Sequence, residues 1–443
     1  MRIPRILISA QSSGSGKTTV TCGILQALAN RGLRLSSFKC GPDYIDPMFH
    51  SKVIGAKSRN LDPFFVDDDM LRYLFARNAK DSDIAVIEGV MGFYDGSDFS
   101  RPDNSSCDVS LKTETPVILI VDGRGSSLSA VAVLKGFLDF NRNLIKGVIF
   151  NRMSQKVFEG VKPVVESMGI IPIGYIPKMK DVVLESRHLG LVMPGEIDDI
   201  RDKLNKVAEL FEETLDMDAI IELSKTAPEM EVIEPKIETA GKVKIGLADD
   251  DAFCFTYEDN IELLQRLGAD IVRFSPLNDE KIPDVDALIL SGGYPELHAE
   301  GLSKNRSMMR SIKDAVDNGM PCIAECGGFM YLHERMEGSD GKMYDTCGVI
   351  KGETKNMQKL TRFGYITLTP KDGSLGTVRG HEFHHWDSDN CGDDWIAENK
   401  KGARYGCIHD DGRLMAGYPH IYYYSNPKFA AEIIRRASVY SKS

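Results

Sequence analysis

The sequence lacks any long hydrophobic run. Its longest apolar stretches, such as Pro116–Val121 and Ala287–Leu290, are far shorter than the roughly 20 residues that span a bilayer. The stretch Met1–Ile8 resembles the start of a signal peptide, but Gln11–Lys17 interrupts it before an apolar core forms, so we interpret it as a first strand. We therefore expect no membrane partner.

Basic residues are also in deficit. The chain has 54 Lys and Arg against 65 Asp and Glu, a formal net charge of −11, which argues against a nucleic-acid partner because such surfaces are basic. The nine cysteines are scattered, and the one close pair, Cys322 and Cys326, does not have a usual zinc spacing. Free thiols in a reducing cytoplasm are the simplest expectation.

What is present is alternation of short apolar runs with helical periodicity, in 443 residues of which 42% are hydrophobic. This pattern predicts an α/β fold built on parallel sheets covered on both faces. Residues 226–241 carry two prolines and several charges without a clear period, as linkers do. We therefore predict domains at 1–225 and 242–443, with glycine-rich hairpins or loops from about Gly348 to Leu414 at one edge of the second.

A phosphate-binding loop follows the first predicted strand, Arg5–Ala10, and precedes a predicted helix, Thr18–Arg31. Gln11 replaces the first glycine of the strict P-loop pattern, but the rest of the pattern is present. We expect Lys17 to bridge the β- and γ-phosphates of ATP and the Thr18 hydroxyl to bind Mg²⁺. The predicted nucleotide-binding residues of this loop are Gly14, Ser15, Gly16, Lys17, Thr18 and Thr19.

Carboxylates end neighbouring predicted strands. Asp43 and Asp46 follow Leu35–Lys39, while Glu88 ends Ile84–Glu88 and opens a glycine-rich segment that includes Asp95. Carboxylates at this edge of a sheet, beside a P-loop, are well placed to bind Mg²⁺ or a substrate. Asp46 and Glu88 are the stronger candidates; Asp43 and Asp95 also fit ordinary turns.

The second domain carries a candidate nucleophile. Cys326 lies between the predicted strand Pro321–Glu325 and a helix, with the small neighbours Ala324 and Gly328 that a sharp strand-to-helix turn needs. The helix N-terminus is expected to lower the pKa of the thiol. Gly292 and Gly293, after the strand Ala287–Leu290, are candidates for an oxyanion hole.

A base must reach Cys326, and four histidines late in the chain are candidates: His381, His384, His385 and His420. His420 follows an apparent strand, as a catalytic histidine would. The spacing of His381, His384 and His385 suggests a metal site only if the segment is helical, and Gly380 and Phe383 favour a loop or strand instead.

These blocks in this order resemble the cobyrinate a,c-diamide synthase family of glutamine-dependent amidotransferases, over nearly the whole chain. The blocks are Gly14–Thr19, Lys39–Pro47, Arg59–Asp62, Glu88–Gly96, Arg187–Gly190, Asp251–Phe255, Ser291–Leu297, Cys326 with its neighbours, and Gly380–His384. The resemblance implies a first domain like dethiobiotin synthetase and a second like class I glutamine amidotransferases.

The resemblance also implies the chemistry. Glutamine is hydrolysed at Cys326 with help from His420, and ATP with Mg²⁺ converts carboxylates of a tetrapyrrole to acyl phosphates that ammonia attacks. It assigns Thr18, Asp46 and Glu88 to the metal, Asp46, Glu88 and Asp95 to phosphate or substrate, and Asn151 to the adenine. The acid usual two residues after the histidine is Tyr422 here, which leaves a Cys–His pair.

Alternatives remain open at this stage. The family includes enzymes that amidate nickel-sirohydrochlorin on the route to coenzyme F430, and its motifs do not separate the two substrates. A P-loop regulatory ATPase with a binding-only amidotransferase domain is an alternative of another class, although it would not need Cys326. The sequence also leaves open whether the protein forms a homodimer. Arg187, His188 and the Gly380–His385 loop are candidates for tetrapyrrole contact.

Overall fold

A computed structural model describes residues 1–179, 186–187, 190–191 and 200–442. The chain forms two compact units, Met1–Pro235 and Lys236–Ser443. Residues 228–242, which include most of the predicted linker, contain neither helix nor strand. Within the described ranges no helix is both long enough and apolar enough to cross a bilayer.

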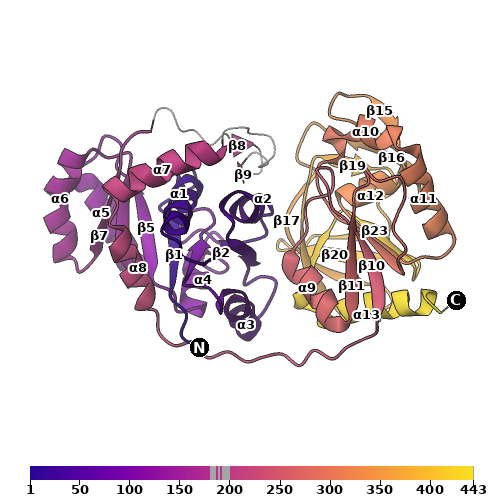
Figure 1. Cartoon of the computed structure of the whole chain (residues 1–443), viewed down its shortest axis with the longest axis horizontal. Coiled ribbons are helices and arrows are strands. Elements are labelled where there is room, and N and C mark those ends of the chain that lie inside the picture. The colour runs from indigo at the N-terminus through magenta and orange to yellow at the C-terminus, as the bar shows by residue number, and fades with distance from the viewer. Residues whose placement is uncertain (180–185, 188–189, 192–199, 443) are drawn as a thin grey trace. The chain divides into compact units, whose positions relative to one another are not determined.

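The first unit is built on a seven-stranded parallel sheet with the order β3-β2-β4-β1-β5-β6-β7 (Figure 1). All six residues of β1 are buried, as expected for a central strand covered on both faces. The strands are β1 (Arg5–Ala10), β2 (Leu35–Cys40), β3 (Lys57–Leu61), β4 (Ile84–Glu88), β5 (Val117–Asp122), β6 (Ile145–Asn151) and β7 (Ile171–Ile176).

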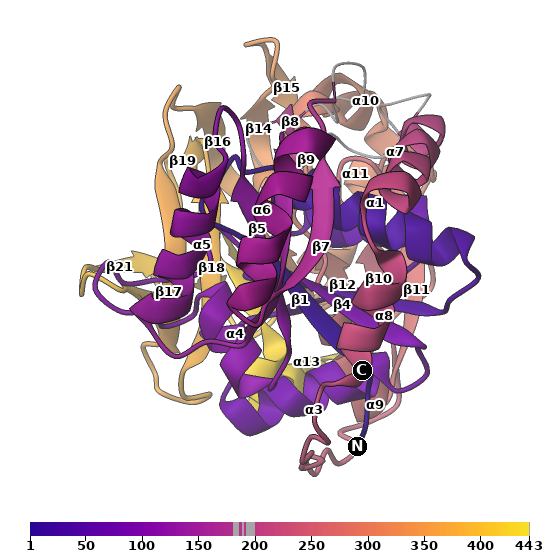
Figure 2. The same ribbon diagram turned by 90° about the vertical axis from the view of Figure 1, so that its left-hand side faces the viewer.

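Helices cover both faces of this sheet. On one face α1 (Lys17–Asn30), α7 (Ile200–Thr214) and α8 (Met217–Lys225) form a core in which Ile24, Phe211 and Ile220 are fully buried. The other face carries α3 (Asp68–Ala79), α4 (Ser106–Lys112), α5 (Leu128–Phe140) and α6 (Gln155–Ser167), and Figure 2 shows α5 and α6 side by side there. Short α2 (Ile45–Phe49) continues into the π-helical turn His50–Ile54, and β8 (Ser186–Arg187) pairs with β9 (Gly190–Leu191).

The second unit has a six-stranded sheet of order β11-β10-β12-β13-β23-β22, parallel except for its last strand. Its strands are β10 (Val243–Ala248), β11 (Ala269–Phe274), β12 (Ala287–Leu290), β13 (Cys322–Glu325), β22 (His409–Asp410) and β23 (Leu414–Gly417). The helices are α9 (Glu258–Leu267), α10 (Ala299–Lys304), α11 (Arg306–Asp317), α12 (Gly327–Leu332) and α13 (Pro427–Tyr440).

The predicted hairpin region forms two further sheets in the second unit. One has the order β15-β14-β16-β19, from β14 (His333–Glu337), β15 (Met343–Asp345), β16 (Ile350–Asn356) and β19 (Trp386–Ser388). The other is antiparallel, β21-β20-β17-β18-β24, from β17 (Arg362–Pro370), β18 (Val378–His384), β20 (Trp395–Asn399), β21 (Arg404–Cys407) and β24 (His420–Tyr422).

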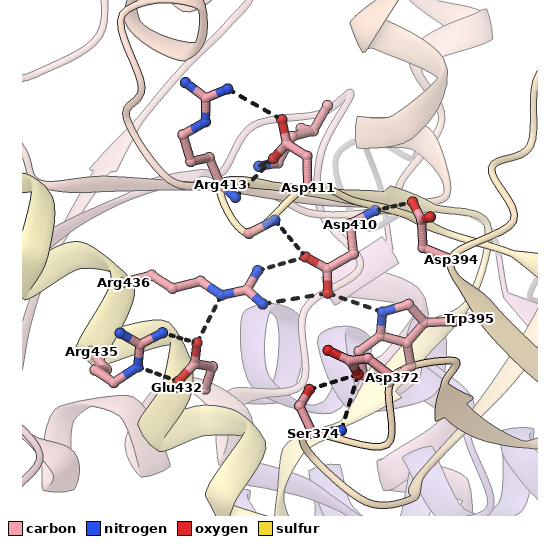
Figure 3. Close-up of polar contacts among 12 residues, drawn as sticks. Asp372, Ser374, Asp394, Trp395, Asp410, Asp411, Arg413, Glu432, Arg435 and Arg436 are labelled. Atoms are coloured by element: carbon pink, nitrogen blue, oxygen red, sulfur yellow. Dashed lines mark hydrogen bonds and ion pairs between the residues drawn. The ribbon is translucent and has the colours of Figure 1, made fainter.

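A mostly buried ion pair joins α13 to β22 of the six-stranded sheet (Figure 3). The guanidinium of Arg436 lies 2.9 Å from Asp410, which also accepts a 3.0 Å hydrogen bond from the Trp395 indole. Glu432, one turn earlier on α13, accepts a 3.1 Å bond from the same guanidinium. Arg436 is therefore paired with two carboxylates, which offsets the cost of burying its charge.

Candidate active site

The phosphate-binding loop lies between β1 and α1, where two glycines adopt left-handed backbone conformations, with φ of 74° at Gly14 and 88° at Gly16. A side chain at Gly16 would come within 2.5 Å of the Asn151 amide nitrogen. That amide donates a 2.8 Å hydrogen bond to the carbonyl of Ser15. Asn151 thus braces the loop from the end of β6, and its predicted contact with adenine stays a prediction.

Lys17 is buried at the start of α1 and donates a 2.6 Å hydrogen bond to the carbonyl of Met91. Burial, aided by the nearby charge of Lys39, lowers the pKa of Lys17 to about 8. A phosphate would restore the charged form, since an anion stabilises an ammonium ion. Thr18 and Thr19 follow in the same helical turn.

Asp46 and Glu88 meet in a buried charge cluster around Lys39, a β2 residue that sequence reasoning had not selected. The Lys39 ammonium lies 2.5 Å from Asp46 and 2.9 Å from Glu88. The Thr18 hydroxyl donates a 2.7 Å bond to Glu88, and His50 lies 3.3 Å from the other oxygen of that carboxylate. Because β2, β4 and β1 are neighbours, their carboxyl ends bring these side chains to one edge of the sheet.

The two carboxylates respond differently to burial. Burial alone would raise the pKa of Glu88, but Lys39 and the hydrogen bond with His50 outweigh it and hold that pKa well below its usual range. Burial and the charge of Glu88 raise the pKa of Asp46 above its ordinary value. The cluster therefore holds one firmly ionised carboxylate and one that takes up a proton more readily.

The donor set suits Mg²⁺. A hydroxyl and carboxylates are the hard oxygen ligands that this ion prefers, and it usually completes its shell with phosphates and water. One oxygen of Asp46, Oδ1, is buried without a hydrogen bond in the structure. Among the described residues, no group of three or more His, Cys, Asp or Glu side chains is arranged to hold a metal ion.

Asp95 holds the segment after β4 in shape, because its carboxylate accepts a 3.0 Å hydrogen bond from the backbone of Gly92. The glycines of this segment allow the close approach predicted for them. A side chain at Gly92 would meet the Asp95 carboxylate at 2.4 Å, and one at Gly96 would meet the Asp103 carbonyl at 2.1 Å. Asp43 accepts hydrogen bonds from the backbone of Ile45 and Asp46, as a turn residue does.

Cys326 occupies a strained turn between β13 and α12, with φ of 47° and ψ of −103°. Small neighbours are required there, since a side chain at Gly328 would come within 2.1 Å of the Leu290 carbonyl. Positive φ is unusual for a residue with a side chain and is often found at functional sites. The turn predicted from the sequence, with Cys326 between a strand and a helix, is present.

The expected lowering of the thiol pKa is wrong for the free protein. Burial, followed by the charge of Glu296, raises the pKa of Cys326 well above its ordinary value. The short α12 does not offset the loss of solvent. A thiolate at Cys326 therefore depends on transfer of the proton to a base.

His420, in β24, is the candidate base that the fold brings near this turn. A side chain at Gly292 would come within 2.4 Å of the His420 ring, and one at Gly327 would come within 3.1 Å of the Gly293 nitrogen. The Gly292–Gly293 segment thus lies between His420 and the residue that follows Cys326. Burial, together with the neighbouring His381 and His384, lowers the pKa of His420, so its imidazole is neutral and weakly basic in the free protein.

Glu325, which the sequence did not single out, lies beside this pair. One carboxylate oxygen is 3.8 Å from Nδ1 of His420, and the other accepts a 3.3 Å hydrogen bond from the backbone of Ile421. Burial raises the pKa of Glu325 to about 8. Tyr422 donates its hydroxyl hydrogen bond to Asp259 at 3.0 Å.

The Gly380–His385 segment is not the loop considered for tetrapyrrole contact, because residues up to His384 belong to strand β18. His381 pairs in register with His420 and stacks on its ring at 4.9 Å, while His384 stacks on Tyr418 at 3.9 Å. Side chains three residues apart on a strand point to opposite faces, so His381 and His384 are not placed to bind one metal ion together. Arg187 lies in β8, and His188 lies outside the described residues.

Two family models match this chain, one in each unit. Residues 6–192 match the CobQ/CobB/MinD/ParA nucleotide binding domain, and residues 244–428 match the CobB/CobQ-like glutamine amidotransferase domain. Two solved structures align at low scores. A glutamine amidotransferase is 15% identical over 44% of this chain and 98% of its own, with a TM-score of 0.33. The MinD cell division protein of Aquifex aeolicus is 17% identical over 52% of this chain and 99% of its own, with a TM-score of 0.30.

Curated relatives align over almost their full length. A cobyrinate a,c-diamide synthase of Listeria monocytogenes is 41% identical over 95% of this chain and 97% of its own. That of Thermoplasma volcanium is 37% identical over 100% of this chain and 99% of its own, and that of Fusobacterium nucleatum is 39% identical over 96% and 99%. The chain belongs to the cobyrinate a,c-diamide synthase family.

Proposed function

We propose that this protein amidates the a and c acetate carboxylates of cobyrinic acid, with ATP as activator and glutamine as nitrogen donor. The observation that supports the proposal is that one chain carries both the buried Lys39–Asp46–Glu88 cluster beside the phosphate-binding loop and the strained Cys326 turn near the Gly292–His420 contact. The relatives' names supply the substrate. We place the protein in the cytoplasm, because ATP, glutamine and reduced thiols are found there.

In the first unit, the backbone N–H groups of residues 14–19 and the Lys17 ammonium hold the phosphates of ATP. A carboxylate oxygen of the substrate attacks the γ-phosphorus, and the bond to the bridging oxygen breaks with release of ADP. Lys39 is placed to balance charge on the phosphoryl group as it transfers. Thr18, Asp46 and Glu88 would hold Mg²⁺, which neutralises phosphate charge when bound.

In the second unit, the Cys326 thiol gives its proton to His420 and the sulfur attacks the carboxamide carbon of glutamine. The backbone N–H groups of Gly292 and Gly293 stabilise the oxyanion. His420 returns the proton to the departing nitrogen, which leaves as ammonia, and water then hydrolyses the thioester to glutamate. The ammonia attacks the acyl phosphate carbonyl, and phosphate departs to leave the amide.

The test is an amidation assay with ATP, Mg²⁺ and glutamine, followed by mass spectrometry, with cobyrinic acid and nickel-sirohydrochlorin in separate reactions. Each conversion lowers the mass by about one unit, and two conversions of cobyrinic acid are expected. Product from the nickel compound alone would overturn the cobalt assignment. Absence of product from either, with ATP still hydrolysed, would favour a regulatory ATPase.

Two variants assign the halves of the reaction. Cys326→Ala should lose amidation driven by glutamine but keep amidation driven by added ammonium chloride. Lys17→Ala should lose both, because no acyl phosphate forms, while it keeps basal glutaminase activity. Retention of glutamine-driven amidation in Cys326→Ala would remove the nucleophile assignment.

A further inference from the structure

A hollow beside the phosphate-binding loop has no place in the chemistry described so far. It encloses about 470 Å³ and is lined by Gln11, Tyr94, Asp95, Gly136, Phe137 and Phe140, with Val133 at its edge. We call it the α5 hollow, because most of its apolar lining comes from that helix. Its size falls in the range of small-molecule sites.

The helix that lines the hollow carries apolar residues on part of its exposed surface, beside the exposed Lys135–Asp139 ion pair. Only three residues of α5 are buried, Ala130, Val131 and Leu134, while Val133 and Phe140 are 39% and 75% exposed. A surface helix usually carries polar residues on its outer face. The outward apolar residues of α5 therefore indicate a surface that a ligand covers.

The aromatic wall is held in place before any ligand arrives. The Tyr94 hydroxyl donates a 2.7 Å hydrogen bond to the Phe137 carbonyl. The Tyr94 and Phe137 rings stack with centroids 5.6 Å apart and an interplanar angle of 20°, and the Phe140 ring lies 5.2 Å from Tyr94. The Phe140 ring is tilted by 57° from the Tyr94 ring, so the three rings form a fixed aromatic wall whose apolar surface suits an apolar ring system.

The glycine at position 136 supports the same kind of ligand. It lies in the interior of α5, where glycine weakens a helix relative to alanine. A side chain built there would meet nothing within 4 Å, so packing within the protein does not require a glycine. The missing side chain leaves one part of the wall open to close approach.

The hollow adjoins the predicted site of phosphoryl transfer. Gln11, which lines it, is the first residue of the phosphate-binding loop, and the segment from Met91 to Asp95 runs from the Lys17 ammonium to the hollow. Its lining includes a carboxylate and no lysine or arginine. It therefore suits the apolar face of a ring rather than the ring's carboxylates, which would extend toward Lys17 and solvent.

We propose that the α5 hollow binds the face of the substrate's tetrapyrrole ring and so presents its acetate side chains to the phosphate-binding loop. The inference rests on the proposed function for the identity of the ring. It places tetrapyrrole contact on Tyr94, Gly136, Phe137 and Phe140, a set that differs from the Gly380–His385 segment.

The test compares Gly136→Leu with Gly160→Leu in the full-length protein. Both glycines lie inside exposed helices with nothing within 4 Å of an added side chain, but only Gly136 lines the hollow. Gly136→Leu should raise the KM for cobyrinic acid at least about tenfold, with the KM for ATP and glutaminase activity within about twofold of wild type. Gly160→Leu should leave all three unchanged. An unchanged KM for cobyrinic acid in Gly136→Leu would overturn the inference.

Phe140→Asp and Leu128→Ala separate a ligand site from a protein interface. Phe140→Asp should weaken cobyrinic acid binding measured by equilibrium dialysis without ATP, while Leu128→Ala, exposed on the same helix outside the hollow, should not. Loss of a dimer in Phe140→Asp, seen by sedimentation with unchanged cobyrinic acid binding, would make α5 an interface and overturn the inference.

The two proposals fail in different ways. Binding of cobyrinic acid that depends on Phe140, without amidation by wild type, would keep the hollow and remove the proposed function. Amidation with a normal KM for cobyrinic acid in both Gly136→Leu and Phe140→Asp would keep the proposed function and remove the hollow as the tetrapyrrole site. A wild-type protein that neither binds nor amidates cobyrinic acid would overturn both.

Discussion

The hydroxyl of Thr18 donates a 2.7 Å hydrogen bond to Glu88, which joins the first turn of α1 to the end of β4. The same carboxylate is paired with Lys39 at 2.9 Å. A single buried carboxylate therefore orients both the hydroxyl expected to bind Mg²⁺ and the cation expected to face the transferred phosphoryl group.

Glu88→Gln should lower the kcat of amidation at least about 100-fold, because it removes the charge that fixes Thr18 and Lys39 while it preserves size. Basal glutaminase activity should stay near the wild-type value. Glu222→Gln, whose side chain is 71% exposed on α8, provides the control and should be neutral. Equal loss of both activities in Glu88→Gln would indicate a folding defect instead.

Gly292→Ala should lower glutaminase activity at least about 100-fold, because the new methyl group would displace the His420 ring, which lies 2.4 Å from its position. Amidation driven by ammonium chloride should continue. Gly301→Ala, whose nearest neighbour would be 3.4 Å away, is the matched control. Normal glutamine use by Gly292→Ala would show that His420 is not held where the reaction needs it.

Glu325→Gln should change how stability depends on pH. Burial raises the pKa of Glu325 from 4.5 to about 8, so between these values the folded state binds a proton that the unfolded state does not. Raising the pH through this window therefore destabilises the wild type, by up to about 1.4 kcal/mol per pH unit, and the variant escapes this loss.

The measurement is urea unfolding from pH 5 to pH 8, followed by fluorescence of the protein's two tryptophans, Trp386 and Trp395, both in the second unit. The free energies of unfolding of the two proteins should converge near pH 5 and separate as pH rises, in favour of the variant. A difference that stays constant with pH would contradict the buried, protonated state of Glu325.

Asp410→Ala should lower the free energy of unfolding of the second unit by about 2 kcal/mol, because it leaves the mostly buried Arg436 with one carboxylate and removes the partner of the Trp395 indole (Figure 3). The tryptophan fluorescence assay measures this directly. Arg435→Ala removes a pair on the surface, where the Arg435 side chain is 62% exposed, and should cost less than about 1 kcal/mol. Similar losses in both variants would argue against a buried pair.

Much of the fold could be predicted because apolar runs mark parallel strands. The predicted strands Arg5–Ala10, Ile84–Glu88 and Ala287–Leu290 coincide with β1, β4 and β12. The Gly348–Leu414 region was predicted as hairpins or loops, and the structure shows antiparallel pairing there. Its assembly into two sheets depends on long-range pairing, such as β18 with β24, that local sequence does not encode.

The site was predicted only where motifs name residues. Lys39 was missed because a lysine at the end of a strand gives no signal of its own; only the fold shows that Asp46 and Glu88 surround it. Glu325 was missed for a similar reason, since its proximity to His420 arises from two separate strands. The thiol pKa was predicted with the wrong sign because a helix N-terminus can be read from sequence, whereas burial cannot.

The raised pKa of Cys326 also has a consequence for the enzyme at rest. Peroxides and alkylating reagents attack the thiolate, and reactivity falls with the fraction of that form. An enzyme without bound glutamine therefore keeps the Cys326 thiol protonated and poorly reactive toward these reagents. The buried turn that holds Cys326 thus also protects its sulfur from oxidation and alkylation between turnovers.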